Sequence, residues 1–136
     1  MRLVPFAAAF VLLAPVPPGG AAQAAERIDG RWKGAYECGQ GKTELTLILN
    51  SHGGGNLTGD FQFRYGDVYG SYRLTGTITP QGELKLNPTV WITRPAGHEM
   101  VGLTGRAYDR SGEGKPDALY GDVTDNRCGK FAAEKQ

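Results

Sequence analysis

The sequence contains few of the residues that usually carry catalysis or bind metals. Its 136 residues include two histidines and two cysteines. It has no G-x-S-x-G elbow, no H-E-x-x-H pair and no phosphate loop, the short motifs that mark many hydrolases, metalloproteases and nucleotide-binding enzymes. Two isolated cysteines also lack the paired spacing of a zinc site. We therefore expect a protein that is not an enzyme and that carries no metal and no cofactor.

An excess of charge of either sign is also missing. Once Arg2 is removed with the predicted leader, 14 of the 15 basic residues remain, which equals the 14 acidic residues. A neutral chain has no electrostatic reason to bind polyanions. Nucleic acid and anionic membranes are therefore excluded as main partners.

The one long apolar run stands near the start of the chain. Residues 3–16 (LVPFAAAFVLLAPV) follow the single charge of Arg2, and Ala22–Ala24 supply the small residues that a signal peptidase reads. This run is too short for a stable membrane span. We expect residues 1–24 to be a signal peptide cleaved before Ala25. Residues 25–136 would then form one domain, located in the periplasm or secreted.

Cys38 and Cys128 both lie in this exported part, where an oxidising compartment favours a disulfide. With two cysteines the pairing is unambiguous, and the alternative is a pair of buried free thiols. Closing a loop of roughly 90 residues stabilises a fold by about 4–5 kcal/mol in the chain-entropy model. That is a large share of the total stability of a small domain, about 5–15 kcal/mol.

A five-residue motif recurs along the chain, and it predicts strands rather than helices. It reads LTGDF from Leu57, LTGTI from Leu74, LTGRA from Leu103 and LYGDV from Leu119. In a strand, the large residue, the glycine and the final apolar residue point to one face. Glycine normally weakens a strand. Large and small residues that alternate on an inner face are typical of a narrow closed barrel, where glycine also lets the strand coil.

Turn-forming residues divide the chain into eight expected strands. The expected ranges are 30–38, 42–50, 56–65, 68–79, 82–87, 100–108, 118–124 and 128–134. Pro88 interrupts the fifth run, and the stretch 89–99 that follows it is expected to be partly extended. The fold class is therefore all-β, an eight-stranded antiparallel up-and-down β-barrel closed by one disulfide. We expect Trp32, Tyr36, Phe61 and Phe63 to fill its interior. The other face is rich in charge, which indicates a soluble barrel because basic residues facing lipid cost about 2–4 kcal/mol each.

The opening pattern W-x-G-x-Y-x-C-x-Q-G-x-T-x-L-x-L, from Trp32 to Leu47, resembles that of a small secreted bacterial domain, found mostly in proteobacteria. The resemblance covers most of the mature chain and implies fold and export, without a catalytic motif. A looser likeness, in GRW at residues 30–32 and YRLTG at residues 72–76, is to streptavidin-like and other calycin barrels. Biotin binders of that type use several tryptophans around the ligand, whereas this chain has two, Trp32 and Trp91. The likeness therefore does not imply a ligand for this chain.

Two segments have the composition of recognition surfaces, RYGDVYGSYR (64–73) and VWITRPAGHEM (90–100). Tyrosine, tryptophan and arginine give contact area at low entropic cost and dominate binding hot spots. The alternative is that these aromatics cap the ends of the barrel. The candidate binding residues are Tyr65, Tyr69, Arg73, Trp91, Arg94 and His98.

The function that we expect is a non-enzymatic exported binding protein whose partner is an unidentified protein or glycan. An inhibitor of a hydrolase, such as a lysozyme or a protease, is one form of that role, on fold-level analogy. The first alternative is a lipocalin-like carrier of a small apolar ligand. The second is a small enzyme that uses glutamate and histidine at the rim of the barrel.

Overall fold

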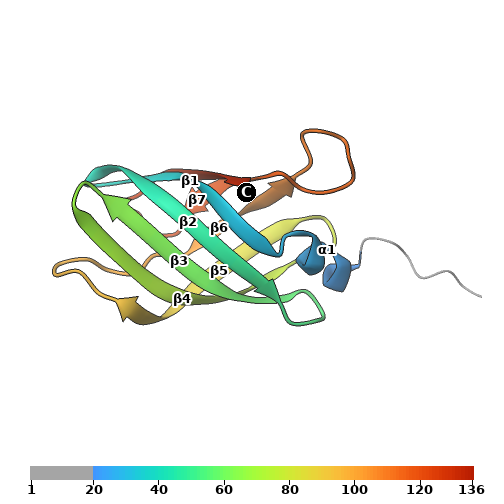
Figure 1. Cartoon of the computed structure of the whole chain (residues 1–136), viewed down its shortest axis with the longest axis horizontal. Coiled ribbons are helices and arrows are strands. Elements are labelled where there is room, and N and C mark those ends of the chain that lie inside the picture. Colours follow the sequence, from blue (N-terminus) through green and yellow to red (C-terminus); the bar gives the residue numbers. More distant parts are fainter. Residues whose placement is uncertain (1–19) are drawn as a thin grey trace, which may run out of the picture.

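A computed structural model describes residues 20–136. Within this range the chain forms one short helix followed by eight strands (Figure 1). The elements are α1 (Ala21–Arg27), β1 (Gly30–Cys38), β2 (Gly41–Ser51), β3 (Asn56–Tyr65), β4 (Val68–Ile78), β5 (Glu83–Thr93), β6 (Leu103–Tyr108), β7 (Ala118–Val123) and β8 (Lys130–Lys135). Most of the predicted signal peptide, residues 1–19, lies outside the described residues.

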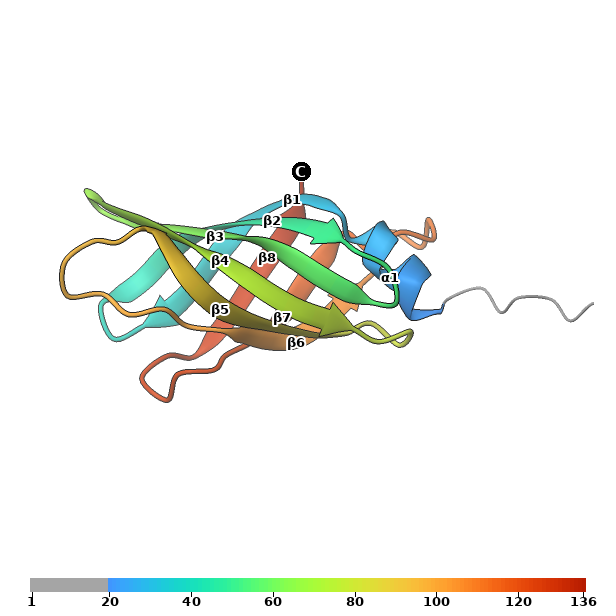
Figure 2. The same ribbon diagram turned by 90° about the horizontal axis from the view of Figure 1, so that it is seen from below.

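The strands close into one barrel. Each strand pairs antiparallel with the next along the chain, and β8 pairs back to β1. The closing ladder runs from Trp32 opposite Lys135 to Tyr36 opposite Phe131. Figures 1 and 2 show the tilted strands surrounding a common interior. The predicted eight-stranded antiparallel up-and-down β-barrel is confirmed.

The predicted disulfide is present at the closing seam. Cys38 ends β1, and Cys128 lies in the connection that leads into β8. Next to it, the backbone N–H of Gly129 donates a hydrogen bond to the carbonyl oxygen of Glu37 at 2.8 Å. The bond joins residues 90 positions apart, so it covalently secures the contact that closes the barrel.

The fifth strand is longer than predicted. The prediction ended it at residue 87, before Pro88, but β5 continues through this proline to Thr93. β5 pairs with β6 over Glu83–Leu86, whereas its pairing with β4 continues to Thr93. A proline is tolerated at an edge of a sheet, where one side of the ladder has ended. Pro88 therefore marks where β5 becomes an edge and does not end the strand.

The sixth strand is shorter than predicted. It begins at Leu103 and not at residue 100. The preceding Val101 forms its hydrogen bonds with the side chain of Tyr72, at 2.5 Å through its carbonyl oxygen and 2.9 Å through its N–H. Val101 is thus held by a tyrosine hydroxyl, whereas Gly102 is hydrogen-bonded to Thr124 directly after β7.

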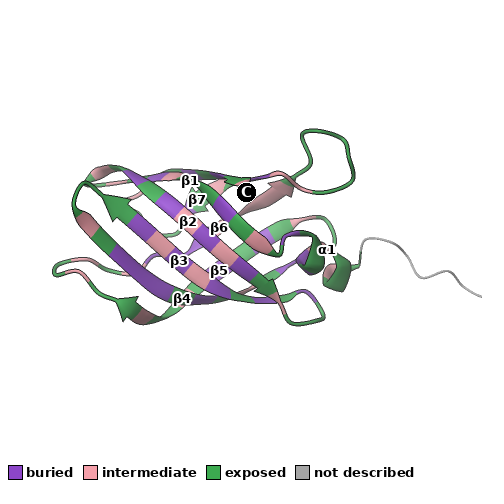
Figure 3. Cartoon of the chain, viewed as in Figure 1, coloured by how far each residue is buried: buried purple, intermediate pink, exposed green. Residues whose placement is uncertain are grey.

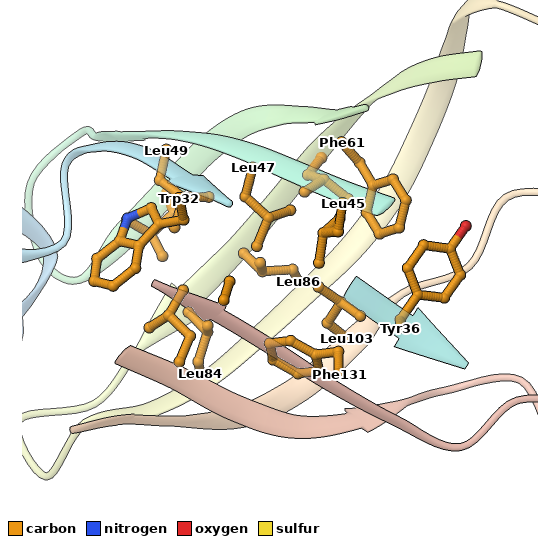
Figure 4. Packing of buried hydrophobic residues seen from close by; sticks show 14 of the residues in the cluster. Trp32, Tyr36, Leu45, Leu47, Leu49, Phe61, Leu84, Leu86, Leu103 and Phe131 are labelled. Atoms are coloured by element: carbon orange, nitrogen blue, oxygen red, sulfur yellow. The ribbon is translucent and has the colours of Figure 1, made fainter. Parts of the chain in front are cut away.

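Large side chains fill the barrel. Trp32, Tyr36, Phe61 and Phe63 are all buried, with 5% or less of their surface exposed, as predicted. Phe61 stacks on Tyr72 with 4.6 Å between ring centroids. Leucines from several strands complete this cluster (Figure 4), and buried residues alternate with exposed ones along the strands (Figure 3).

The recurring glycines lie opposite large residues of neighbouring strands, except that Gly105 and Gly121 face each other across β6 and β7. Gly59 pairs with Leu49 on β2 and with Leu74 on β4. A Cβ atom added at Gly76 would overlap the carbonyl oxygen of Lys85 on β5. Glycine is therefore required for two reasons: it alternates with leucine around the interior, and it lets neighbouring backbones approach closely.

The helix α1 closes one end of the barrel and was not predicted. Ala25 and Ile28 are fully buried there, and the indole N–H of Trp32 donates a hydrogen bond to the carbonyl oxygen of Ile28 at 2.9 Å. The sequence interpretation assigned residues up to Ala24 to the leader and sought helices after residue 26. Cleavage before Ala25 would fall inside α1 and would leave both buried residues with the barrel.

Replacing Gly76 by alanine is expected to lower the free energy of unfolding by about 1–3 kcal/mol, because the new methyl group must push β4 away from β5. Urea unfolding followed by circular dichroism measures this change. Gly39→Ala is the matched control, since nothing lies within 4 Å of a Cβ atom added there. Equal unfolding midpoints for the two variants would contradict the steric account.

Replacing Ile28 by alanine is expected to lower the free energy of unfolding by about 2–4 kcal/mol, because it leaves a cavity beneath the cap. Ile92→Ala is the control, as this isoleucine is 49% exposed on β5 and should change stability by less than about 0.5 kcal/mol. Chemical denaturation of both variants provides the comparison. A loss at Ile28 no larger than at Ile92 would show that the cap adds little to the fold.

Candidate functional site

The two ends of the barrel differ. The helix α1 lies at one end with the β2–β3, β4–β5 and β6–β7 connections, which we call the capped end. The opposite end, the open end, carries the β1–β2, β3–β4, β5–β6 and β7–β8 connections (left in Figure 1). Because the strands alternate in direction, residues far apart in the sequence meet at the open end.

Tyr65 and Tyr69 lie at the open end, on either side of the tight β3–β4 turn. Their residues are 40% and 36% exposed. The guanidinium group of Arg64 lies 5.2 Å from the centre of the Tyr69 ring, a distance at which a cation and an aromatic face attract. This turn therefore presents an exposed pair of tyrosines beside a positive charge.

Trp91, Arg94 and His98 also meet at the open end, around one aromatic cluster. The ring of Trp91 packs 5.3 Å from that of Tyr72 and 6.4 Å from that of Phe63. The guanidinium group of Arg94 lies 5.7 Å from the centre of the Trp91 ring. The rings of His98 and Phe63 are 5.7 Å apart. Trp91 and His98 thus extend the core outward at the end of the barrel, and their role in binding stays a prediction.

The sixth candidate, Arg73, lies apart from the others. It is on the outer wall of β4, opposite Asp60 of β3. Its Nε atom is 3.5 Å from the Asp60 carboxylate, and its side chain is 64% exposed. Such a surface ion pair contributes little to stability, and the structure does not bring Arg73 to the open end.

A cavity of about 270 Å³ opens at this end, and we call it the cup. Its deeper part is formed by Tyr36, Phe63 and Val101, each 9% exposed or less. The disulfide forms part of its wall. The polar side chains that line the cup are Gln40, His98, Glu99, Asp125 and Arg127. Three of the four connections at the open end, β1–β2, β5–β6 and β7–β8, contribute to this lining.

The charges at the rim of the cup are paired with one another. The guanidinium group of Arg127 donates hydrogen bonds to Asp125 at 2.7 Å and to Glu99 at 3.2 Å. Hydrogen bonds from the side chain and backbone of Arg127 lower the pKa of Asp125 to about 2. The carboxylate is therefore ionised at neutral pH, and the rim cluster of two carboxylates and one guanidinium group carries a formal charge of −1.

Tyr36 and Tyr72 are both buried near the cup, but their hydroxyl groups differ. The hydroxyl of Tyr72 donates to the carbonyl oxygen of Val101 and accepts from its N–H group. Among residues 20–136, the hydroxyl of Tyr36 has no hydrogen-bond partner, although the residue is 5% exposed. Burial raises the pKa of Tyr36 above its usual value. A buried polar group without a partner is rare in folded proteins, so this hydroxyl marks the cup as unusual.

Sequence reasoning missed most of the cup. It placed Tyr36 among the interior residues and did not single out Gln40, Glu99, Asp125 or Arg127. One signal was available, because Tyr36 lies two residues before Cys38 on the same face of the strand. The disulfide at the seam places both residues at one end of the barrel.

His52 lies at the capped end, where its Nε2 atom is 2.6 Å from the hydroxyl oxygen of Thr58. The hydroxyl of the preceding Ser51 donates instead to Asp29 at 3.0 Å, so these sequence neighbours have different partners. Within residues 20–136, no three histidine, cysteine or acidic side chains gather in a group that could hold a metal ion. In the same range, no helix has the length and apolarity needed to cross a membrane.

A scan of the chain against models of known protein families finds no match, and a search of the curated proteins finds none either. The barrel agrees with the fold that both sequence resemblances implied. The bacterial family suggested by the pattern from Trp32 to Leu47 stays a prediction.

Substituting each tyrosine by phenylalanine should separate their roles. Tyr72→Phe leaves both backbone groups of Val101 unpaired, so it is expected to lower the free energy of unfolding by about 1–3 kcal/mol. Tyr36→Phe removes a hydroxyl without a partner, so stability should stay constant or rise. Urea unfolding of the oxidised variants measures both values. A loss in Tyr36→Phe as large as in Tyr72→Phe would mean that the fold itself satisfies the Tyr36 hydroxyl.

Proposed function

We propose that this protein is a non-enzymatic, exported binding protein that recognises a macromolecule with the open end of its barrel. The observation that carries this proposal is the gathering of Tyr65, Tyr69, Trp91, Arg94 and His98 at one end, beside the cup. The other end is closed by α1 and its buried residues. The protein would act in the periplasm or outside the cell.

The open end has the properties of a preorganised recognition surface. Its connections begin and end on strands of a closed barrel, and the disulfide ties two of them together. Tyr69 and Trp91 each have an arginine against the ring, which restrains both side chains. Aromatic and arginine side chains held in place before binding lose little conformational entropy on association.

Two observations favour this role over a lipocalin-like carrier. A carrier needs an enclosed apolar cavity of several hundred Å³, but the interior is occupied by Trp32, Phe61 and Tyr72, each fully buried. The cup lies at the mouth of the barrel and has a charged rim. Recognition at the surface therefore fits the geometry better than transport inside the barrel. Inhibition of a hydrolase is one form that such recognition can take.

Pull-down experiments with the oxidised protein, purified after export into a bacterial periplasm, test the proposal. The bait is mixed with periplasmic or host extract, and bound proteins and glycans are identified by mass spectrometry. Tyr69→Ala is expected to weaken the affinity for the specific partner by about 30-fold, because loss of a hot-spot side chain costs about 2 kcal/mol of binding free energy. Its melting temperature should stay unchanged because this side chain is exposed.

Tyr108→Ala is the matched control, since Tyr108 is 42% exposed and ends β6 at the capped end. It should retain the partner fully. Loss of the partner in both variants, or retention in both, would contradict recognition by the open end. Recovery of a lipid or pigment in place of a macromolecule would support the carrier instead.

A further inference from the structure

We propose that the cup is a subsite for one neutral sugar unit of a glycan, with the hydroxyl of Tyr36 as its deepest polar contact. This inference rests on the proposed function, and it specifies the chemistry of the partner at the open end. Four properties of the cup lead to it: a buried hydroxyl without a partner, a rim whose arginine is already paired, an aromatic wall and an amide with a hydrogen-bonded donor.

The hydroxyl of Tyr36 points to a polar ligand. Tyr36 is 5% exposed and lines the cup, and Figure 4 shows its hydroxyl directed away from the leucine cluster. No atom of residues 20–136 forms a hydrogen bond with it. A buried hydroxyl left unpaired destabilises a fold, and a ligand that both donates and accepts hydrogen bonds removes that penalty. Sugar hydroxyl groups do both.

The rim of the cup argues against a charged ligand. An anion would need a free cation, but Arg127 is already hydrogen-bonded to Asp125 and Glu99. A cation would have to compete with Arg127 for the two carboxylates, which leave the rim with a formal charge of −1. Either ligand would have to compete with these pairs, of which Arg127–Glu99 is solvent-exposed and therefore weak. A neutral ligand can accept hydrogen bonds from the cluster while its ion pairs stay intact.

The wall of the cup includes two aromatic rings. The rings of Phe63 and His98 lie 5.7 Å apart and are inclined by 31°, and Val101 adds aliphatic surface beside them. The C–H groups on one face of a pyranose ring are apolar and pack against such rings, while its hydroxyl groups project from the edge. A sugar ring therefore has an apolar face and a polar edge, which match the apolar and polar residues that line the cup.

An amide beside the cup is already oriented. The Nε2 atom of Gln40 donates a hydrogen bond to the hydroxyl of Thr43 at 2.9 Å, and Thr43 is fully buried. This bond fixes the amide plane and leaves the amide oxygen to accept from a ligand hydroxyl. The volume of about 270 Å³ is at the small end of ligand sites. It suits one sugar ring better than a longer oligosaccharide, whose remaining units would extend over the open end.

Amide NMR titrations of the isotope-labelled, oxidised protein test this inference. The probes are D-glucose, D-galactose, D-mannose and N-acetyl-D-glucosamine, with choline and inorganic phosphate as charged probes. At least one sugar is expected to give saturable shifts, in the millimolar range, at the amides of Gln40, His98 and Val101. The loop at residues 109–117, at the capped end, should remain unshifted.

Tyr36→Phe is expected to weaken the binding of that sugar by about fivefold to tenfold without lowering the melting temperature. Gln40→Ala provides a second variant, because Gln40 is exposed and its removal leaves the core intact. Tyr108→Phe is the matched control and should bind as the wild type does.

Saturable shifts with choline or phosphate and none with the sugars would overturn the inference, as would the absence of saturable shifts with every probe. Sugar binding of equal strength in Tyr36→Phe would overturn it as well. These results are separable from failure of the proposed function. A protein partner that depends on Tyr69 would still be recovered in the pull-down, and only the sugar subsite would be lost.

Discussion

The pairing of β1 with β8 is the contact on which the rest of the structure depends. It joins the two ends of the sheet, so that the large residues of eight strands share one interior. Non-local pairing of this kind carries a large cost in loop-closure entropy, and the disulfide between Cys38 and Cys128 reduces the cost by restricting the unfolded chain. Closure also fixes the relative positions of the four connections at the open end. The interior and the candidate site therefore have the same origin.

Because large side chains fill the interior, the candidate site lies at one end of the barrel. Trp32 and Ile28 occupy the capped end, where the indole N–H is hydrogen-bonded to the cap. At the open end, Tyr72 uses its hydroxyl to hold Val101 in the mouth, so this polar atom serves the fold. Tyr36 is also buried, but its hydroxyl has no hydrogen-bond partner among residues 20–136. The contrast between these tyrosines separates a hydroxyl that holds the fold together from one that is left without a partner.

Alternation of period two, the recurring glycines and the cysteine count were sufficient to predict the barrel, its strand number and its disulfide. Alternation reports which face of a strand is buried, and the glycines report where two backbones lie close together. With two cysteines, the disulfide pairing has one solution. The extension of β5 beyond Pro88 was missed because the effect of a proline depends on whether a neighbouring strand is present, and β6 begins too late to pair there. The helix α1 was missed because its residues resemble the end of a signal peptide.

The cup was missed for a different reason. Tyr36, His98 and Arg127 meet through the closure of the barrel, and no periodic pattern in the sequence relates them.

The disulfide has a second consequence, because it belongs to the wall of the cup as well as to the seam. One oxidation event therefore completes both the fold and the shape of the mouth. In a reduced chain, the β7–β8 connection, which carries Asp125 and Arg127, would be tethered to the end of β1 by hydrogen bonds alone. If the protein binds a partner at the open end, as we propose, reduction of the disulfide would alter the surface that the partner contacts.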